Sequence, residues 1–219
     1  GGLHGVGVSV TNALSNRLEV TVWRDGLEST IAFENGFVKE ELKSIKSPRP
    51  KRATGTRVRC WPNPKYFDSP KIPRAQLIRL LRSKAVLLPG CEVIYINEAE
   101  DIRQTWKYTG GLKEYLLDQV SGKSIVTPFE AKGYATEEDE MFPEGEGAAW
   151  VVTWTEEGNL ERESYVNLIP TPLGGTHEAG LRDGIYQAVR SFMETHGLGA
   201  KGVRLIVEDV FARASFVLN

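Results

Sequence analysis

Apolar residues recur with a helical period in four parts of the chain. Near the N-terminus, Val6, Val10, Ala13 and Leu14 follow the i, i+4, i+7, i+8 spacing of one helix face. The clearest helical pattern begins at Pro73, a residue that suits the first turn of a helix, and ends at Pro89-Gly90, a pair that stops a helix. The predicted helices are residues 6–14, 73–88, 111–120 and 180–195.

Alternation of apolar and polar residues predicts β-strands between these helices. Leu18, Val20 and Val22 alternate with polar neighbours, and Asp-Gly and Asn-Gly dipeptides follow at residues 25–26 and 35–36. Such dipeptides tolerate positive φ and are strong hairpin signals, so an antiparallel meander is expected. The other predicted strands are residues 55–61, 91–97, 102–108, 148–155, 161–169, 204–210 and 214–218, with 148–155 paired to 161–169.

Two stretches are predicted to be exposed and without regular structure. Residues 43–52 hold five basic residues and two prolines. In residues 123–147 the composition shifts, and six carboxylates between Glu137 and Glu146 crowd around Pro143 and nearby glycines, which leaves little apolar area to bury. One α/β pattern closes near Thr109 and a second begins there, so the sequence predicts an α+β protein with domains at residues 1–108 and 109–219.

Composition and charge exclude several classes of protein. The chain has 219 residues, of which 41% are hydrophobic and 26% are charged, with a formal net charge of −2. This balance argues against a protein that coats polyanions with its whole surface, although it leaves room for a local basic patch. No apolar stretch approaches the roughly 20 residues that cross a bilayer, and the first residues given do not show the basic n-region and apolar h-region of a signal peptide. We therefore expect a cytoplasmic protein with no membrane partner.

Neither the cysteines nor the histidines predict a metal centre. Cys60 and Cys91 lack Cys-x-x-Cys spacing and are predicted to be small, buried hydrophobic residues. The three histidines are scattered, with no carboxylate or cysteine at ligand spacing. The acidic run lacks the alternating ligands of a calcium loop.

A glycine-rich stretch opens directly into the first predicted helix. Four of the first seven residues are glycine. Glycines let backbone N–H groups approach an anion closely, and a helix N-terminus adds unsatisfied donors and about half a positive charge, so this arrangement suits phosphate. A flexible connector is the alternative, which the adjoining amphipathic helix disfavours. The stretch is neither a Walker A loop nor a Rossmann fingerprint, because the lysine and the third glycine of those motifs are missing.

Residues 2–15, Gly-Leu-His-Gly-Val-Gly-Val-Ser-Val-Thr-Asn-Ala-Leu-Ser, resemble the ATP-lid motif of the superfamily that type II topoisomerases share with Hsp90 chaperones, MutL proteins and histidine kinases. Residues 54–56, Thr-Gly-Thr, resemble the strand at the floor of the adenine pocket. Residues 168–177 resemble the transducer signature, whose Gly-Gly-Thr-His turn is expected to be structural and separates the chain from MutL-type and Hsp90-type proteins. Residues 84–90 and 163–167 are more similar to the topoisomerase IV branch than to the gyrase branch, which is the alternative.

This resemblance implies a fold and a nucleotide site. The chain would be a segment of a longer protein, comprising the C-terminal part of a Bergerat-type ATPase domain and a transducer domain similar to ribosomal S5 domain 2, cut off before its C-terminal end. The catalytic glutamate, the Mg²⁺-holding asparagine and the adenine-reading aspartate would precede Gly1, and the lysine that meets the γ-phosphate would follow Asn219. The segment itself would hold no catalytic and no metal-binding residue. Its implied ATP-binding residues are Gly2, Leu3, His4, Gly5, Val6, Gly7 and Val8, which would wrap the phosphates, and Thr56, which would reach the adenine edge directly or through water. The alternatives are a packing role at the helix entry for His4 and a β-branched residue that fills a strand for Thr56.

The resemblance also implies partners. The intact protein would be the ATP-binding component of the enzyme: it would bind ATP and Mg²⁺, form a homodimer around DNA, and couple hydrolysis to strand passage, decatenation and relaxation. It would work with a separate DNA-cleaving polypeptide in a heterotetramer at the bacterial nucleoid. As an isolated segment, the chain would instead be a phosphate-binding or interaction module without hydrolysis. Lys43, Lys46, Arg49, Lys51 and Arg52 are able to neutralise DNA phosphates, but the sequence favours a solvated basic loop.

Overall fold

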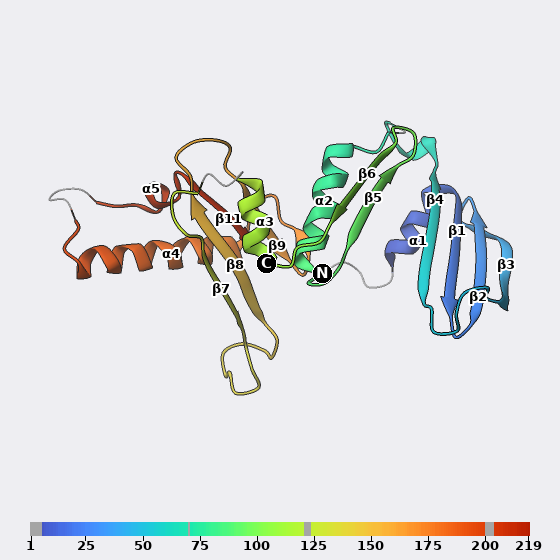
Figure 1. Ribbon diagram of the computed structural model, residues 1–219, viewed down its shortest axis with the longest axis horizontal. Coiled ribbons are helices and arrows are strands. Elements are labelled where there is room, and N and C mark those ends of the chain that lie inside the picture. The colour runs from blue at the N-terminus through green and yellow to red at the C-terminus, as the bar shows by residue number, and fades with distance from the viewer. Residues whose placement is uncertain (1–5, 70, 121–123, 200–203) are drawn as a thin grey trace. The chain divides into compact units, whose positions relative to one another are not determined.

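The chain forms two compact units, Gly1–Pro73 and Arg74–Asn219, each with its own β-sheet (Figure 1). No helix in the described part of the chain is long and apolar enough to cross a membrane. The computed structural model describes residues 6–69, 71–120, 124–199 and 204–219.

The first unit is a four-stranded antiparallel sheet that packs against the helix α1 (Val6–Ala13). The helix α1 confirms the helix predicted near the N-terminus. The strands lie in the order β3-β2-β1-β4, and a short 3₁₀ helix, η1, follows β4. These elements are β1 (Ser15–Arg24), β2 (Leu27–Glu34), β3 (Phe37–Lys46), β4 (Gly55–Pro62) and η1 (Pro64–Tyr66).

Both predicted hairpins are present. Asp25 and Gly26, with φ of 54° and 78°, connect β1 to β2, while Asn35 and Gly36, with φ of 51° and 88°, connect β2 to β3. Positive φ at both central residues is the geometry of two-residue turns whose twist matches that of the flanking strands. The two dipeptides therefore set the register of the meander.

The two faces of this sheet differ in what covers them. Because side chains alternate across a strand, Leu18, Val20 and Val22 share one face, here called the α1 face, on which α1 and Leu18 line a common indentation. Thr21 and Trp23 lie on the opposite face, here called the Trp23 face, and both are buried. Both faces of β1 thus carry buried residues, which alternation in the sequence did not predict.

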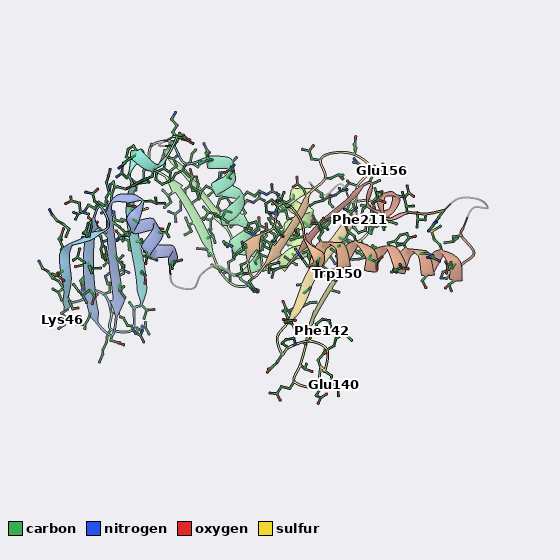
Figure 2. The ribbon with its side chains drawn as sticks, turned by 180° about the vertical axis from the view of Figure 1, so that it is seen from behind. Lys46, Glu140, Phe142, Trp150, Glu156 and Phe211 are labelled. Atoms are coloured by element: carbon green, nitrogen blue, oxygen red, sulfur yellow. The ribbon has the colours of Figure 1, made fainter. Side chains whose placement is uncertain are left out.

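The prediction that residues 43–52 form a loop is wrong for their first part. Residues 43–46 complete β3, which pairs with β2 as far as the partners Leu27 and Lys46 (Figure 2). Because β3 is the edge strand, its lysines stay exposed while its backbone is paired on one side. The connecting loop begins only after the strand and covers residues 47–54.

The second unit is built on a five-stranded sheet in the order β10-β9-β11-β8-β7. The strand β11 runs parallel to β9 and antiparallel to β8. The strands are β7 (Phe129–Tyr134), β8 (Gly147–Trp154), β9 (Arg162–Val166), β10 (Ile169–Pro170) and β11 (Ala214–Leu218), and a separate hairpin consists of β5 (Val93–Asn97) and β6 (Ile102–Trp106). The helices are α2 (Arg74–Leu87), α3 (Gly111–Gln119), α4 (Thr176–Thr195) and α5 (Val207–Phe211).

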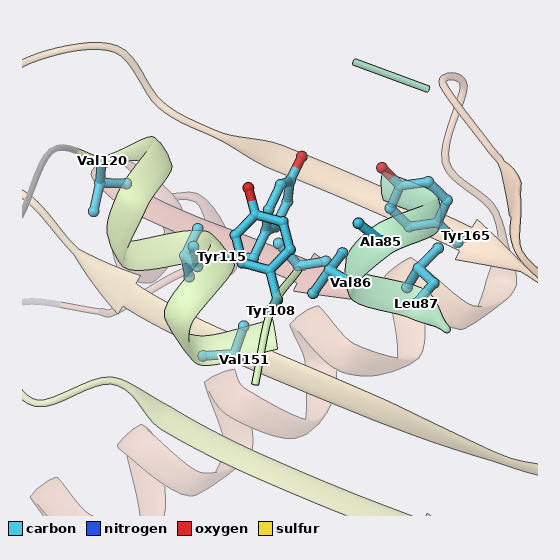
Figure 3. Packing of buried hydrophobic residues seen from close by; sticks show 10 residues of the cluster. Ala85, Val86, Leu87, Tyr108, Tyr115, Val120, Val151 and Tyr165 are labelled. Atoms are coloured by element: carbon cyan, nitrogen blue, oxygen red, sulfur yellow. The ribbon is translucent and has the colours of Figure 1, made fainter. Parts of the chain in front are cut away.

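Helices pack on both faces of this second sheet. On one face, α2 and α3 contribute Val86 and Tyr115 to a core that contains Val151 of β8 (Figure 3). On the other face, α4 and α5 pack against Val152 of β8 and Phe216 of β11. The sheet is therefore the middle layer of three.

The predicted pairing of residues 148–155 with residues 161–169 is wrong. The strand β11 lies between β8 and β9 and pairs with both. All five of its residues are buried, and a short apolar strand of this kind belongs at the centre of a sheet with both faces covered. The strand itself was predicted, but its place between two strands that lie far from it in sequence was not detectable from local alternation.

The strand predicted over residues 204–210 is also wrong, because its second half forms α5. The carboxylate of Asp209 accepts the N–H of Ile206 at 3.0 Å, which satisfies one of the free donors at the start of this helix. Phe211 is 1% exposed in the core beneath it. The local cap and the burial of Phe211 together outweigh the alternating pattern.

The long acidic loop is shorter than predicted. Within residues 123–147, Phe129–Tyr134 forms β7, whose backbone pairs with β8. Residues 135–146 lie outside the helices and strands, and Figure 2 shows Glu140 and Phe142 in this excursion. Its ends are closed by a hydrogen bond from the N–H of Ala135 to the carbonyl of Glu146, at 2.7 Å.

Both cysteines are more exposed than predicted. Cys60 is exposed and Cys91 is partly exposed. Cys60 lies on the α1 face of β4, two residues after Val58, which is 50% exposed. The expectation that both are buried is therefore wrong.

The segment before Thr109 shares a core with the segment after it. Ala85 of α2 and Tyr108 pack in one cluster with Tyr115 and Val217. The compact units accordingly divide after Pro73. The boundary near Thr109, with domains at residues 1–108 and 109–219, stays a prediction about the domains of the intact protein.

Candidate functional site

The described part of the glycine-rich stretch is the first turn of α1, which begins with Val6, Gly7 and Val8. This turn has no acidic side chain, and a Cβ placed on Gly7 would meet nothing within 4 Å. The first N–H groups of a helix have no partner within it, so they are available to an anion at the positive end of the helix dipole. The other predicted residues of the stretch, Gly2, Leu3, His4 and Gly5, lie outside the described residues.

The C-terminal half of α1 is fixed to the sheet, while its first turn is open. Asn12 donates from Nδ2 to the carbonyl oxygen of Gly36, in the turn between β2 and β3, at 3.1 Å. Leu18 and Phe33 of the sheet line an indentation beneath the helix. Val8, by contrast, is 58% exposed. The helix therefore presents its N-terminus from a fixed base.

Thr56 lies on the same face of the sheet as α1. It is the partner of Val22 across the β1–β4 pair, and Val22 shares its face of β1 with Leu18, which lies beneath α1. Its side chain is exposed, beside the half-exposed Val58. A threonine hydroxyl both donates and accepts, so Thr56 is able to bind a polar edge above an apolar strand surface. The structure thus brings two predicted parts of the site, the first turn of α1 and Thr56, to one face of one sheet.

Acidic and histidine side chains do not complete this site as a metal centre. In the part of the chain that the structure describes, no three His, Cys, Asp or Glu side chains gather as metal ligands. The described residues therefore offer contacts for phosphate and for a planar polar ring.

The Gly-Gly-Thr-His turn, residues 174–177, leads into α4 and is held to β9. Gly174 has φ of 70°, and its N–H donates to the carbonyl of Thr171 at 2.9 Å. His177 Nε2 lies 3.1 Å from Thr171 Oγ1, which in turn lies 2.7 Å from Ser164 Oγ. Each of these groups has a partner within the turn or the adjacent strand, in keeping with the structural role predicted for it.

A buried carboxylate in the second unit was not among the predicted functional residues. Glu163 of β9 has a side chain only 5% exposed. Its Oε2 accepts hydrogen bonds from the hydroxyls of Tyr115 and Tyr165, at 3.0 and 2.6 Å, and its Oε1 accepts from Arg79 Nε at 3.0 Å. One side chain thus connects α2, α3 and the sheet.

Burial raises the pKa of the Tyr115 phenol above its ordinary value, and the negative charge of Glu163 raises it further. The pKa of Tyr165 is raised for the same first reason and by its hydrogen bond to Glu163. Both phenols therefore stay protonated and keep donating to the carboxylate. In the sequence, the available signal for this site was that Glu163 is a charged residue within a short predicted strand, which the folded sheet buries.

Comparison with known proteins gives the chain relatives over its whole length. The family model described as DNA gyrase B matches residues 111–219. The chain is 44% identical to the B subunit of DNA topoisomerase 4 from Salmonella typhimurium and 39% identical to that from Francisella tularensis, with the whole chain matched in both cases. It covers 34% of each of these proteins, so it spans about a third of the length of these curated relatives.

Solved structures agree with the sequence relatives. The topoisomerase IV ATP-binding domain of Francisella tularensis, solved with a small-molecule inhibitor, is 38% identical and matches with a TM-score of 0.74 over 100% of this chain and 57% of that one. The 43K ATPase domain of Thermus thermophilus gyrase B, solved with an aminocoumarin, is 28% identical with a TM-score of 0.74 over 98% of this chain and 57% of that one. The predicted α+β fold class is confirmed. By sequence and by fold, the chain belongs to the family formed by the B subunits of DNA topoisomerase IV and DNA gyrase.

Proposed function

We propose that this chain is the part of a type IIA topoisomerase's ATP-binding B subunit that closes over the phosphates of ATP and passes the effect of nucleotide binding to a transducer domain. The observation that carries the proposal is the position of α1. Its open first turn and Thr56 lie on one face of one sheet. The names of the two solved relatives, an ATP-binding domain and an ATPase domain, support the same assignment.

The residues of the first turn fit a phosphate group. Gly7 leaves open space where a side chain would stand, and no carboxylate of the first turn opposes an anion. The N–H groups of Val6, Gly7 and Val8 donate to phosphate oxygens, and residues 2–5 of the same sequence motif would add theirs. Thr56 offers its hydroxyl to the edge of the adenine ring.

ATP, when bound with Mg²⁺, supplies the phosphoryl group whose transfer to water drives the reaction. The chain's own contribution is preorganised backbone donors, which stabilise charge on the phosphate without rearranging. The base and the metal ligands belong to segments outside this chain. Hydrolysis is therefore a property of the whole protein.

The partners of the intact protein follow from this assignment. Closing over ATP would bring two copies together around a DNA duplex, and a DNA-cleaving partner polypeptide, the A subunit, would complete a heterotetramer that passes one duplex through another. Such an enzyme acts in the cytoplasm on the bacterial chromosome. The topoisomerase IV branch is favoured because the relatives at 39% and 44% identity carry that name.

The test is Gly7→Ala in the full-length protein. A methyl group in the space reserved for phosphate should weaken binding of a non-hydrolysable ATP analogue by at least about tenfold, equivalent to about 1.4 kcal/mol. The fold should not suffer, since the new Cβ meets nothing within 4 Å and alanine favours a helix over glycine by up to about 1 kcal/mol.

The matched control is Gly184→Ala in α4. This position is also helical and open, with nothing within 4 Å of the added Cβ, but it lies in the second unit. Calorimetric titration of the analogue should give unchanged affinity for the control. Unchanged affinity in Gly7→Ala as well would contradict the proposed phosphate loop.

A further inference from the structure

Charge is distributed unevenly along the first unit. Between Glu41 and Asp68 the sequence holds no carboxylate, although the chain as a whole has a net charge of −2. That interval carries eight of the 27 basic residues of the chain, which are Lys43, Lys46, Arg49, Lys51, Arg52, Arg57, Arg59 and Lys65. A concentration of this kind creates a local positive potential.

The fold gathers part of this charge beside Trp23. The Arg49 guanidinium lies 3.7 Å from the centre of the Trp23 ring, and that of Arg57 lies 5.4 Å from it. Gly55 is the partner of Trp23 on β4, and the ring lies directly over it, at van der Waals distance (3.8 Å) from where a Cβ would stand. Two cations from different segments thus share one aromatic side chain that is only 6% exposed.

The loop that carries Arg49 is held in place rather than free. The N–H of Ser47 donates to the carbonyl of Gly26 at 2.8 Å, and the N–H of Arg49 donates to Ser47 Oγ at 3.1 Å. Lys51 packs its stem beside Gly26. The loop is exposed, as the sequence predicted, and the structure in addition fastens it to a hairpin and to Trp23.

The nearby carboxylates are already engaged. Glu28 accepts from Trp23 Nε1 at 2.9 Å, Asp25 lies 3.6 Å from Arg24, and Glu19 accepts from Arg17 at 2.7 Å. Four exposed cations of this region, Arg49, Lys51, Arg52 and Arg57, are here called the Trp23 patch. Within the described residues, no carboxylate lies within 4.0 Å of these cations.

We propose that the Trp23 patch binds the phosphate backbone of duplex DNA. Arginines stacked on an aromatic ring keep their planar N–H groups directed to solvent, where they match phosphate oxygens. A sheet face and a short loop, rather than a helix that could enter a groove, hold these cations, so the contacts would be to backbone and independent of sequence. The choice of DNA as the polyanion rests on the proposed function.

The Trp23 patch is distinct from the nucleotide site. Trp23 and Arg57 lie on the Trp23 face of the sheet, whereas Thr56 and α1 lie on the α1 face. A substitution in the patch therefore tests DNA binding without removing a group that contacts ATP. Loss of nucleotide binding in Gly7→Ala and loss of DNA binding here are separate results, so either proposal can fail alone.

The experiment measures binding of a fluorescently labelled duplex to the full chain by anisotropy, over a range of salt concentrations. Two double variants are compared with wild type: Lys51→Gln with Arg52→Gln, in the exposed loop, and Arg49→Gln with Arg57→Gln, at the ring. Each lost phosphate contact should lower the slope of log affinity against log salt by about 0.9, so each double variant should lose nearly 2. The loop variant touches no buried group, so it keeps the test valid if the ring variant fails to fold.

The matched control is Arg103→Gln with Lys107→Gln, which removes two exposed cations in or beside β6 that form no ion pair with another described residue. Its salt slope should equal that of wild type. Equal slopes for wild type and the loop variant would overturn the proposal, as would an equal loss in the control. Tighter binding to a single strand than to the duplex, or full displacement of the duplex by an equimolar acidic peptide, would overturn the assignment to duplex DNA.

Discussion

The buried carboxylate of Glu163 should contribute several kcal/mol to the free energy of unfolding of the second unit, and Glu163→Ala tests this. The substitution leaves the hydroxyls of Tyr115 and Tyr165 without their acceptor in a core where both rings are nearly inaccessible, at 1% and 3% exposed. An unsatisfied buried polar group costs about 1–3 kcal/mol.

The ion pair with Arg79 contributes less to this cost than the two phenols do. The Arg79 side chain is 63% exposed, so it regains water when Glu163 is removed. The two tyrosine hydroxyls that lose their acceptor therefore account for most of the cost, and we expect a loss of about 3 kcal/mol in the free energy of unfolding. For a protein of this size, each kilocalorie lowers the midpoint by about 2–4 °C, which gives a fall of about 6–12 °C.

Thermal unfolding followed by circular dichroism measures this loss. The control is Glu194→Ala, which breaks an exposed pair with Arg190 on α4 and should leave the midpoint unchanged within error. A second variant, Glu163→Ala with Tyr115→Phe, removes one orphaned hydroxyl and should be more stable than the sum of the single losses predicts. A midpoint for Glu163→Ala equal to that of Glu194→Ala would refute the reasoning, and strict additivity of the pair would refute the role given to Tyr115.

Two further predictions follow from the same structure. Because the pKa of Tyr115 is raised in the folded chain, the unfolded chain ionises this phenol first as the pH rises above about 10. The free energy of unfolding should therefore fall with rising pH, and it should fall less steeply in Tyr115→Phe, as measured by denaturant unfolding at several alkaline pH values. An equal slope in both proteins would contradict this prediction. Amide hydrogen exchange should be fast across residues 135–146, which are largely exposed, and slow at the buried C-terminal end of α2. Equal protection of the two segments would show that residues 135–146 are packed and would contradict this prediction.

The sequence by itself determined the features that depend on neighbours along the chain. The Asp-Gly and Asn-Gly turns form because those residues accept positive φ, whatever surrounds them. The helix α2 begins after a proline, and the helix α1 follows its apolar spacing. The resemblance of residues 2–15 to an ATP lid also needed only the order of residues, and the family is confirmed.

The tertiary structure alone decided the features that depend on partners distant in sequence. The place of β11 between β8 and β9 arises because a strand with every residue buried is stable only at the centre of a sheet. Residues 43–46 became a strand because β2 offered their backbone a ladder, and no local signal records the presence of that partner.

The chemistry of charged residues followed the same division. Counting charges locates the basic stretch, but only the fold sets Arg49 and Arg57, from two different segments, beside Trp23. Glu163 looked like an ordinary charged residue until two tyrosines and Arg79 from other elements surrounded it. Burial and pairing are properties of the folded chain, because they depend on which distant groups displace water from a side chain.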